Sequence, residues 1–352
     1  HVHGMLLDGE ERIQFERDDL HRETRRTLGH QLGLKTVYDP AGRVIQTALQ
    51  REKAPMPIVD RRYRYDAAGQ LTQIEDSNRG YIDYRYDPVG RLIEAASPWS
   101  RERFAFDPAS NIVDVAADAG AKGPHMTPAV YKPREESTLP REVPKILGNL
   151  LKHYAGMHFE YDERGNLIAK RTPKGEQRYE WDAFNRLMTA MVKEGERRVA
   201  ASYFYDALGR RIAKSVNGER TLFGWDGDTL AYESSEQGSR HYVYEAGSFV
   251  PLAQFVSQAQ VRGIETPVWK STDRYLPEED PLQRVAQPAA QAQVFYYQCD
   301  HIGTPYMMTD EAGDVVWEAT YKAWGETQEV IARVSKAAGV APGNSIRFQG
   351  QQ

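Results

Sequence analysis

The sequence predicts an all-β protein: an array of β-hairpins that pair edge to edge into one long, coiling sheet. Three observations predict it. A Tyr-Asp-x-x-Gly pattern recurs at a spacing of about 20 residues, and apolar and polar residues alternate beside each copy. The 352 residues also include 20 Tyr, 11 Phe and 6 Trp, which need surfaces to pack on, and this excludes a disordered chain.

The pattern occurs in five close copies and several degenerate ones. The close copies are Tyr38, Asp39 and Gly42; Tyr65, Asp66 and Gly69; Tyr86, Asp87 and Gly90; Tyr161, Asp162 and Gly165; and Tyr205, Asp206 and Gly209. The degenerate copies keep the aspartate, at Asp18, at Phe106-Asp107, at Trp181-Asp182 and at Trp225-Asp226. One long insertion, between Asp107 and Asp162, explains the single large departure from the repeat spacing.

Each copy reads as a β-hairpin. Tyr63 and Tyr65 lie on one face of a strand because side chains alternate with a period of two. Asp at the first position and Gly at the fourth suit a type I turn, with Gly in the left-handed conformation that begins the return strand. A lone hairpin is barely stable, so we expect neighbours to pair and to bring their aromatic residues into register. Strand twist would then coil this sheet, polar on both faces, into a container wall.

Two proline-rich segments interrupt the array and define the expected organisation. Hairpins are predicted over residues 1–116 and 146–256, a loop over 117–145, a second loop over 257–293, and a distinct C-terminal region over 294–352. Within the last region, the spacing of Val330, Ile331 and Val334 predicts one short helix over residues 328–338.

Composition excludes several classes of protein. Charged residues make up 27% of the chain, and no stretch approaches the roughly 18 apolar residues of a membrane-spanning helix. The formal net charge of −5 gives no general electrostatic reason to bind nucleic acid or an anionic membrane. Cys299 is the single cysteine, which suits a reducing cytoplasm. No signal peptide is recognisable, and we expect the chain to be a segment of a longer protein.

The C-terminal region carries a more specific pattern. It contains Asp-His-Ile-Gly-Thr-Pro, then Thr-Asp-Glu-Ala-Gly, then Trp-Gly, then Arg-Phe-Gln-Gly-Gln. In this order the motifs resemble the C-terminal core of Rhs proteins, the bacterial YD-repeat family. The repeats alone would also fit insecticidal toxin-complex subunits or animal teneurins, but the first motif favours Rhs. The matching residues are Asp300, His301, Gly303, Thr304, Pro305, Trp324, Gly325, Arg347, Phe348 and Gly350.

The resemblance implies a structural role. Rhs shells enclose a C-terminal toxin domain in a hollow β-cocoon and keep it inactive until delivery, commonly by a type VI secretion system. The implied partners are the toxin as enclosed cargo, the N-terminal part of the same shell, and a secretion-apparatus spike protein with its chaperone. The implied location is the bacterial cytoplasm, followed by export. The aspartates that free the toxin would follow residue 352, so no catalytic residue is carried over.

Three groups of residues could in principle form a reactive or metal-binding site. Cys299 and His301 could suggest a nucleophile and a base or a metal site, but neither a third ligand nor an orienting group lies nearby in sequence. His1 and His3 resemble a metal pair, and the acidic run 278–280 resembles a calcium loop without its alternating ligand pattern. We therefore expect no catalytic, metal or cofactor site, and treat the repeat aspartates as turn residues.

Two other functions remain open from sequence. Exposed Tyr and Trp side chains could form sugar platforms in an adhesion or carbohydrate-binding module, which specific binding on a glycan array would support. The chain could also be a self-cleaving protease, which a discrete, aspartate-dependent cut in the purified protein would support.

Overall fold

The computed structural model describes residues 3–7, 10–113, 146–147, 150–154, 156–261, 274–277, 280, 292–323, 325–335 and 342–346. The described residues form β-strands and turns, with no α-helix among them, which confirms the all-β prediction. None of them forms a helix able to cross a membrane.

Two long sheets contain most of the strands. The N-terminal sheet consists of β1 (Gly4–Leu7), β2 (Glu10–Arg17), β3 (Glu23–Leu28), β4 (Leu32–Tyr38), β5 (Val44–Arg51), β6 (Val59–Tyr65), β7 (Leu71–Asp76), β8 (Gly80–Tyr86), β9 (Leu92–Ala96) and β10 (Arg101–Arg103). The C-terminal sheet consists of β15 (His153–Tyr154), β16 (Met157–Tyr161), β17 (Leu167–Thr172), β18 (Gly175–Trp181), β19 (Leu187–Glu194), β20 (Arg197–Tyr205), β21 (Arg211–Val216), β22 (Glu219–Asp226), β23 (Thr229–Ser235), β24 (Gly238–Tyr244), β25 (Pro251–Ser257), β26 (Gln293–Cys299), β27 (Pro305–Asp310), β28 (Val315–Tyr321) and β29 (Thr327–Ala332). Two short hairpins lie between them in sequence: β11 (Ala105–Phe106) with β12 (Ile112–Val113), and β13 (Ile146–Leu147) with β14 (Leu150–Leu151).

Strand order in both long sheets follows the chain without a crossover. The N-terminal sheet has 10 strands and the C-terminal sheet has 15, and each strand pairs antiparallel with its neighbours in sequence. Where we expected one continuous sheet, the described residues form two, on either side of the proline-rich segment 117–145. That segment and most of 257–293 lie outside the described residues.

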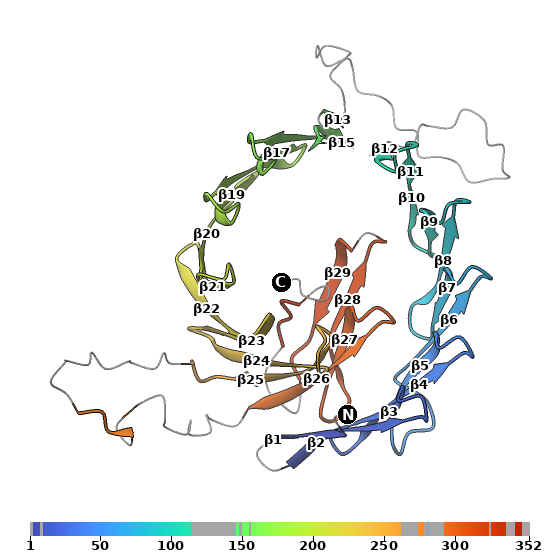
Figure 1. The fold of residues 1–352 in the computed structure, drawn as a ribbon. Helices are drawn as coiled ribbons and strands as arrows, with labels where there is room; N and C mark the ends of the chain where they lie inside the picture. The colour runs from blue at the N-terminus through green and yellow to red at the C-terminus, as the bar shows by residue number, and fades with distance from the viewer. Residues whose placement is uncertain are drawn as a thin grey trace.

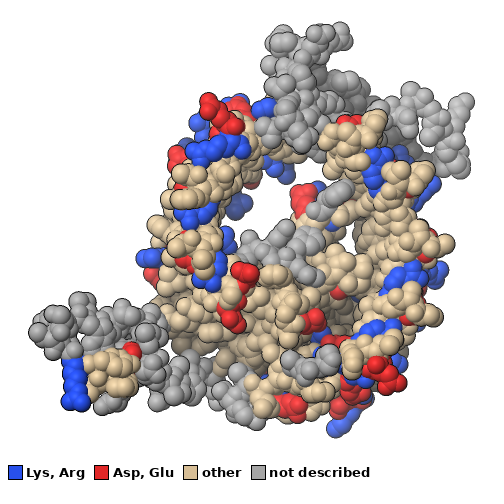
Figure 2. All heavy atoms as spheres, in the orientation of Figure 1, with Lys and Arg blue, Asp and Glu red and all other residues tan. Residues whose placement is uncertain are grey.

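The sheets curve around a common interior. In Figure 1, β1–β12 form one arc of an open ring and β13–β25 form the other, while β27–β29 lie inside the ring. The space-filling view in Figure 2 shows open space between the arc around β15–β22 and these inner strands. The described fold is therefore a curved wall whose last strands turn inward.

The helix expected over residues 328–338 is wrong within the described residues. Thr327–Ala332 form β29, which pairs with β28 from Trp317↔Ala332 to Tyr321↔Thr327, and residues 333–335 are not helical. Helical spacing in a short apolar run is a weak signal, and here the open edge of β28 offers backbone partners at every position. Residues 336–338 lie outside the description.

The main hydrophobic core lies where the two sheets pack against each other. Five buried aliphatic residues of β2–β6 contact six buried residues of β25–β27. The members are Ile13, Leu28, Leu32, Leu49 and Val59 from the N-terminal sheet, and Leu252, Ala253, Val294, Tyr296, Tyr306 and Met307 from the C-terminal sheet. This contact joins the first hairpins of the chain to its last strands. We call it, together with the polar contacts beside it, the closure seam.

The two faces of the wall differ in character. The register of β18–β25 places Tyr179, Tyr203 and Phe223 on the same face as Gln254, which contacts the segment 342–346 inside the ring. The opposite face of β17 and β18 carries ion pairs such as Arg171–Glu176. We expected both faces to be polar, but the inner face carries these aromatic residues.

Candidate functional site

The repeated turn is the first element of the candidate site. At Asp39 the backbone N–H donates to the Arg43 carbonyl at 2.9 Å, and the Gly42 N–H donates to the Asp39 carbonyl at 2.9 Å. The Asp39 carboxylate accepts from the Arg43 backbone N–H at 2.9 Å. Gly42 has φ 84°, the left-handed conformation that glycine adopts without strain. The same backbone pattern occurs at Asp66, Asp87, Asp162, Asp182 and Asp206.

The fourth turn position tolerates exceptions that explain the degenerate copies. Gly69, Gly90, Gly165 and Gly209 have φ between 84° and 89°. Asn185 takes this position in the Trp181-Asp182 copy with φ 60°, and Ser110 takes it after Asp107 with φ 66°. Asparagine enters this region more readily than other residues with a side chain, so the turn survives the loss of glycine.

In four of the repeat turns, an arginine that follows the turn links it to the next one. The Arg43 guanidinium donates to Asp39 Oδ2 at 2.7 Å and stacks over the Tyr65 ring at 4.7 Å from its centroid. A cation over an aromatic face is attracted by the ring quadrupole. The arrangement recurs for Arg22 with Tyr38, Arg91 with Phe106 and Arg186 with Tyr205. Our sequence reasoning missed this role, although the arginine recurs directly after the turn glycine.

The tyrosine or tryptophan before six of the repeat turns also donates a hydrogen bond back to the preceding unit. The Tyr65 hydroxyl donates to the Val44 carbonyl at 2.9 Å, and the Trp181 indole N–H donates to the Leu167 carbonyl at 2.8 Å. In both cases the acceptor lies five residues after the aspartate of the preceding turn. The same bond joins Tyr38 to Glu23, Tyr86 to Leu71, Tyr205 to Leu187 and Trp225 to Arg211. Consecutive turns are therefore held together by side chains as well as by the strand ladders.

The C-terminal motif continues the same architecture. Asp300 donates its N–H to the Thr304 carbonyl at 2.9 Å, Gly303 has φ 83°, and Pro305 begins β27. Turns of the same kind follow at Asp310 and at Lys322, where Gly325 has φ 85°. The Tyr321 hydroxyl donates to the Pro305 carbonyl at 2.8 Å, which repeats the link between units. Trp324, Arg347, Phe348 and Gly350 lie outside the described residues.

Polar contacts line the closure seam, and arginines of the N-terminal sheet make most of them. Arg51 donates to Asp314 at 2.7 Å and to the Ala312 carbonyl at 3.0 Å. Arg79 donates to the Ala319 carbonyl at 2.7 Å. The list continues with the pairs Arg12–Glu311 and Arg26–Glu245, and with Ala323, whose N–H donates to Glu102. Arg61 combines an ion pair to Asp76 at 2.6 Å with a position 3.6 Å from the Tyr306 ring centroid.

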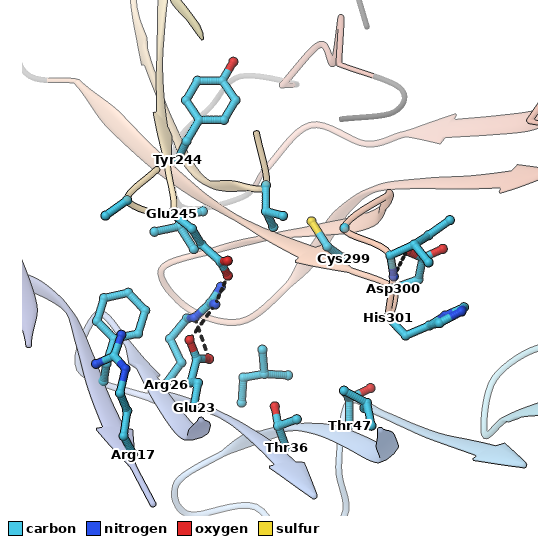
Figure 3. A pocket seen from close by; sticks show the side chains of 18 of the residues that line it. Arg17, Glu23, Arg26, Thr36, Thr47, Tyr244, Glu245, Cys299, Asp300 and His301 are labelled. Carbon is cyan, nitrogen blue, oxygen red and sulfur yellow. Dashed lines mark hydrogen bonds and ion pairs between the residues drawn. The ribbon is translucent and has the colours of Figure 1, made fainter. Parts of the chain in front are cut away.

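A cavity of about 750 Å³ opens beside the seam (Figure 3). Its walls come from β2–β5, from the turn after β24 and from the turn at Asp300. Arg26 lies between the carboxylates of Glu23 and Glu245, at 2.8 and 2.6 Å. The three groups together carry a formal net charge of −1, and the Arg26 guanidinium is already occupied by its two carboxylate partners.

Cys299 and His301 border this cavity but do not form a catalytic pair. Burial raises the pKa of the Cys299 thiol well above its usual value, so the thiol stays protonated, and its Sγ lies 3.6 Å from the Pro251 carbonyl. The two side chains point away from each other in Figure 3, and the His301 ring packs on Tyr63 with centroids 5.1 Å apart. Burial also lowers the His301 pKa.

The other candidate ligands do not gather either. No group of three or more His, Cys, Asp or Glu side chains arranged to hold a metal occurs among the described residues. Asp280 accepts a hydrogen bond from Tyr275 at 3.0 Å, whereas Glu278, Glu279 and His1 lie outside the description. The described residues thus form a wall in which consecutive repeats are linked by side chains and the two long sheets meet at the closure seam.

Comparison with known proteins supports this picture at the level of family. The model described as RHS Repeat matches residues 61–98 and 161–199, and the model described as RHS protein matches residues 294–331. Double-stranded DNA deaminase toxin A of Burkholderia cenocepacia is 33% identical over 369 residues, which cover 100% of this chain. Toxin protein Tse5 of Pseudomonas aeruginosa is 32% identical over 378 residues, again covering 100% of the chain.

The chain belongs to the Rhs family of YD-repeat proteins. This Rhs chain spans 23% of the length of the Burkholderia toxin and 27% of the length of Tse5. Among solved structures, the TcdB2-TccC3-Cdc42 complex matches 98% of the Rhs chain with a TM-score of 0.55 at 16% identity, over 17% of that chain. TcdB2-TccC3 without its hypervariable C-terminal region matches 97% with a TM-score of 0.53 at 15% identity, also over 17% of that chain. These structures share the fold.

Proposed function

We propose that this Rhs chain is a wall segment of a bacterial toxin shell, which encloses the toxin domain of the same polypeptide and performs no catalysis itself. The observation that carries the proposal is the shape: two long sheets curve around an interior, and the last strands of the chain turn into it. A closed wall acts sterically, because an enclosed domain reaches neither its targets nor the space it needs to fold.

The construction of the wall supports this function. Neighbouring hairpins pair along their whole length, so few backbone donors remain open within each sheet. The arginine and tyrosine links add contacts between units that the sheet ladder alone does not supply. We propose a structural role for the turn residues and for the Asp300–Pro305 motif, and no catalytic one.

The remaining parts of the assembly are proposed from the family. Hairpins 1–116 and 146–256 would form wall, segments 117–145 and 257–293 would be insertions, and residues 294–352 would begin the core region. Because the chain spans about a quarter of its two toxin relatives, the preceding shell would complete the enclosure. A spike protein of a type VI or similar apparatus, with a chaperone, would deliver the protein after its synthesis in the bacterial cytoplasm.

Protease protection tests the proposal. The longer natural protein, with whatever domain follows residue 352, is treated with thermolysin and compared with that domain produced alone. We expect the enclosed domain to survive at least ~10-fold longer, because cleavage then requires opening of the shell. Equal rates of digestion would overturn the encapsulation proposal, whereas protection of the domain would support it.

A further inference from the structure

Residues 342–346 lie against the inner face of the C-terminal sheet, although none of them is part of a strand. The described chain end lies inside the ring in Figure 1. Asn344 is 8% exposed and Ile346 is 2% exposed. A segment without strand pairing is ordinarily exposed, so its burial requires side-chain contacts with the wall.

Three buried side chains of the wall meet the polar groups of this segment. Gln254 Nε2 donates to the Gly343 carbonyl at 3.0 Å. The Tyr297 hydroxyl lies 2.6 Å from Gln254 Oε1 and 3.2 Å from Asn344 Oδ1, so it bridges wall and segment. The Ser345 hydroxyl lies 3.0 and 3.1 Å from the two oxygens of Glu233 and donates to that carboxylate.

The three wall side chains also bond within the wall, Gln254 to Tyr297 and Glu233 to residues of β24. Gln254, Tyr297 and Glu233 are 0%, 1% and 4% exposed. Glu233 also accepts from the Tyr242 hydroxyl at 2.6 Å and from Arg240 at 3.2 Å. Burying an amide or carboxylate without a hydrogen-bond partner costs free energy. This face therefore favours binding of an extended chain whose backbone and side chains supply those partners.

An apolar pocket completes the contact surface. Ile346 forms a buried cluster with Phe223, Leu230 and Tyr242 of β22, β23 and β24. These three wall residues are 5%, 1% and 6% exposed. One patch of the inner wall thus hydrogen-bonds the polar residues 343–345 and buries the aliphatic side chain of Ile346. We call this patch the inner clamp.

We propose that the inner clamp is a peptide-binding site whose ligand is the segment 342–346 of this same chain. Because the clamp would hold residues 342–346 inside the ring, the residues that follow them in sequence would begin in the interior. The functional meaning rests on the proposed encapsulation, whereas the binding itself does not. Since the described part of the segment adds no strand to the ladder, it can detach without breaking the sheet.

Trypsin provides a direct test, because Arg347 follows Ile346 and cleavage requires several extended, accessible residues around the bond. The full chain is digested, and cutting after Arg347 is compared with cutting after the exposed Arg274. We expect slow cutting after Arg347 in the wild-type protein. Ile346→Asp should speed it ~10-fold or more, because an aspartate is not tolerated in the apolar pocket and the open population governs cleavage.

Two further variants keep the test decisive. Ser345→Ala removes only the hydroxyl that donates to Glu233 and should give a smaller increase. Val334→Asp places the same charge at a side chain that is 64% exposed, and it should leave cutting after Arg347 unchanged. Circular dichroism confirms that each variant is folded. Wild-type cutting after Arg347 as fast as after Arg274, or equal rates for Ile346→Asp and Val334→Asp, would overturn the clamp, even if a following domain stays protected.

Discussion

At the residue scale, the repeat aspartates act on the backbone of their own turns. The carboxylate of Asp182 accepts from the Phe184 N–H at 2.8 Å, the Arg186 N–H at 2.9 Å and the Arg186 guanidinium at 2.7 Å. The pKa values of Asp39, Asp87 and Asp182 lie below the usual 3.8. The main cause is the hydrogen bond from the backbone N–H of the arginine four residues later, and the hydrogen bond from the side chain of that arginine adds to it. Recurrence of this turn therefore distributes acid sensitivity over several repeats.

The sign of the pH dependence follows from these lowered values. The unfolded chain binds protons at these carboxyls more readily than the folded chain does. The stabilisation is therefore complete above the unfolded pKa near 3.8, and it is lost as pH falls through the lower folded values. We expect the free energy of unfolding, measured with urea, to decrease below about pH 4. Asp87→Asn should flatten this decrease, and an unchanged profile in that variant would contradict the assignment.

At the element scale, the hairpin is joined to its neighbour by the aromatic residue before each turn. Tyr205 is the last residue of β20, directly before the turn, and its hydroxyl donates to the Leu187 carbonyl at the start of β19. The Arg186 guanidinium covers the same ring at 5.3 Å and donates to the Asp206 carbonyl at 3.1 Å. One aromatic side chain thus takes part in two links between consecutive units.

Removing the hydroxyl alone isolates one of these links. Tyr205→Phe leaves the ring in place and leaves the Leu187 carbonyl without this donor, so we expect a loss of about 1 kcal/mol in the free energy of unfolding. Tyr81→Phe serves as a control, because its side chain is 49% exposed, and should cost almost nothing. Chemical denaturation of both variants measures the difference. Equal stabilities would show that strand pairing alone joins the units.

At the scale of the whole molecule, the two arcs are joined at one end by the closure seam, where β2–β6 pack against β25–β27. Leu28, Leu32 and Leu49 are 0% exposed there, although they lie far in sequence from Tyr296 and Met307. Elsewhere the wall is one sheet thick, so the seam is where the curved array gains a two-layer core.

Truncation at the seam should weaken the closure. Leu49→Ala removes buried methyl groups and leaves a cavity, for which we expect a loss of about 3 kcal/mol in stability. Small-angle X-ray scattering should also show a larger radius of gyration if the two arcs separate. Leu20→Ala, at a side chain that is 70% exposed, is the matched control. A Leu49→Ala protein as stable and compact as this control would contradict the role of the seam.

The sequence by itself determined the repeated hairpin, because the turn, the strand alternation and the aromatic position are local and recur with one spacing. It therefore predicted the all-β class and the antiparallel order of neighbours. Only the tertiary structure decided the division into two long sheets, the strand at Thr327–Ala332 and the seam through Arg51, Arg61 and Arg79. These depend on which distant surfaces meet once the ribbon has curved, and that curvature is the sum of many small twists that no single repeat encodes.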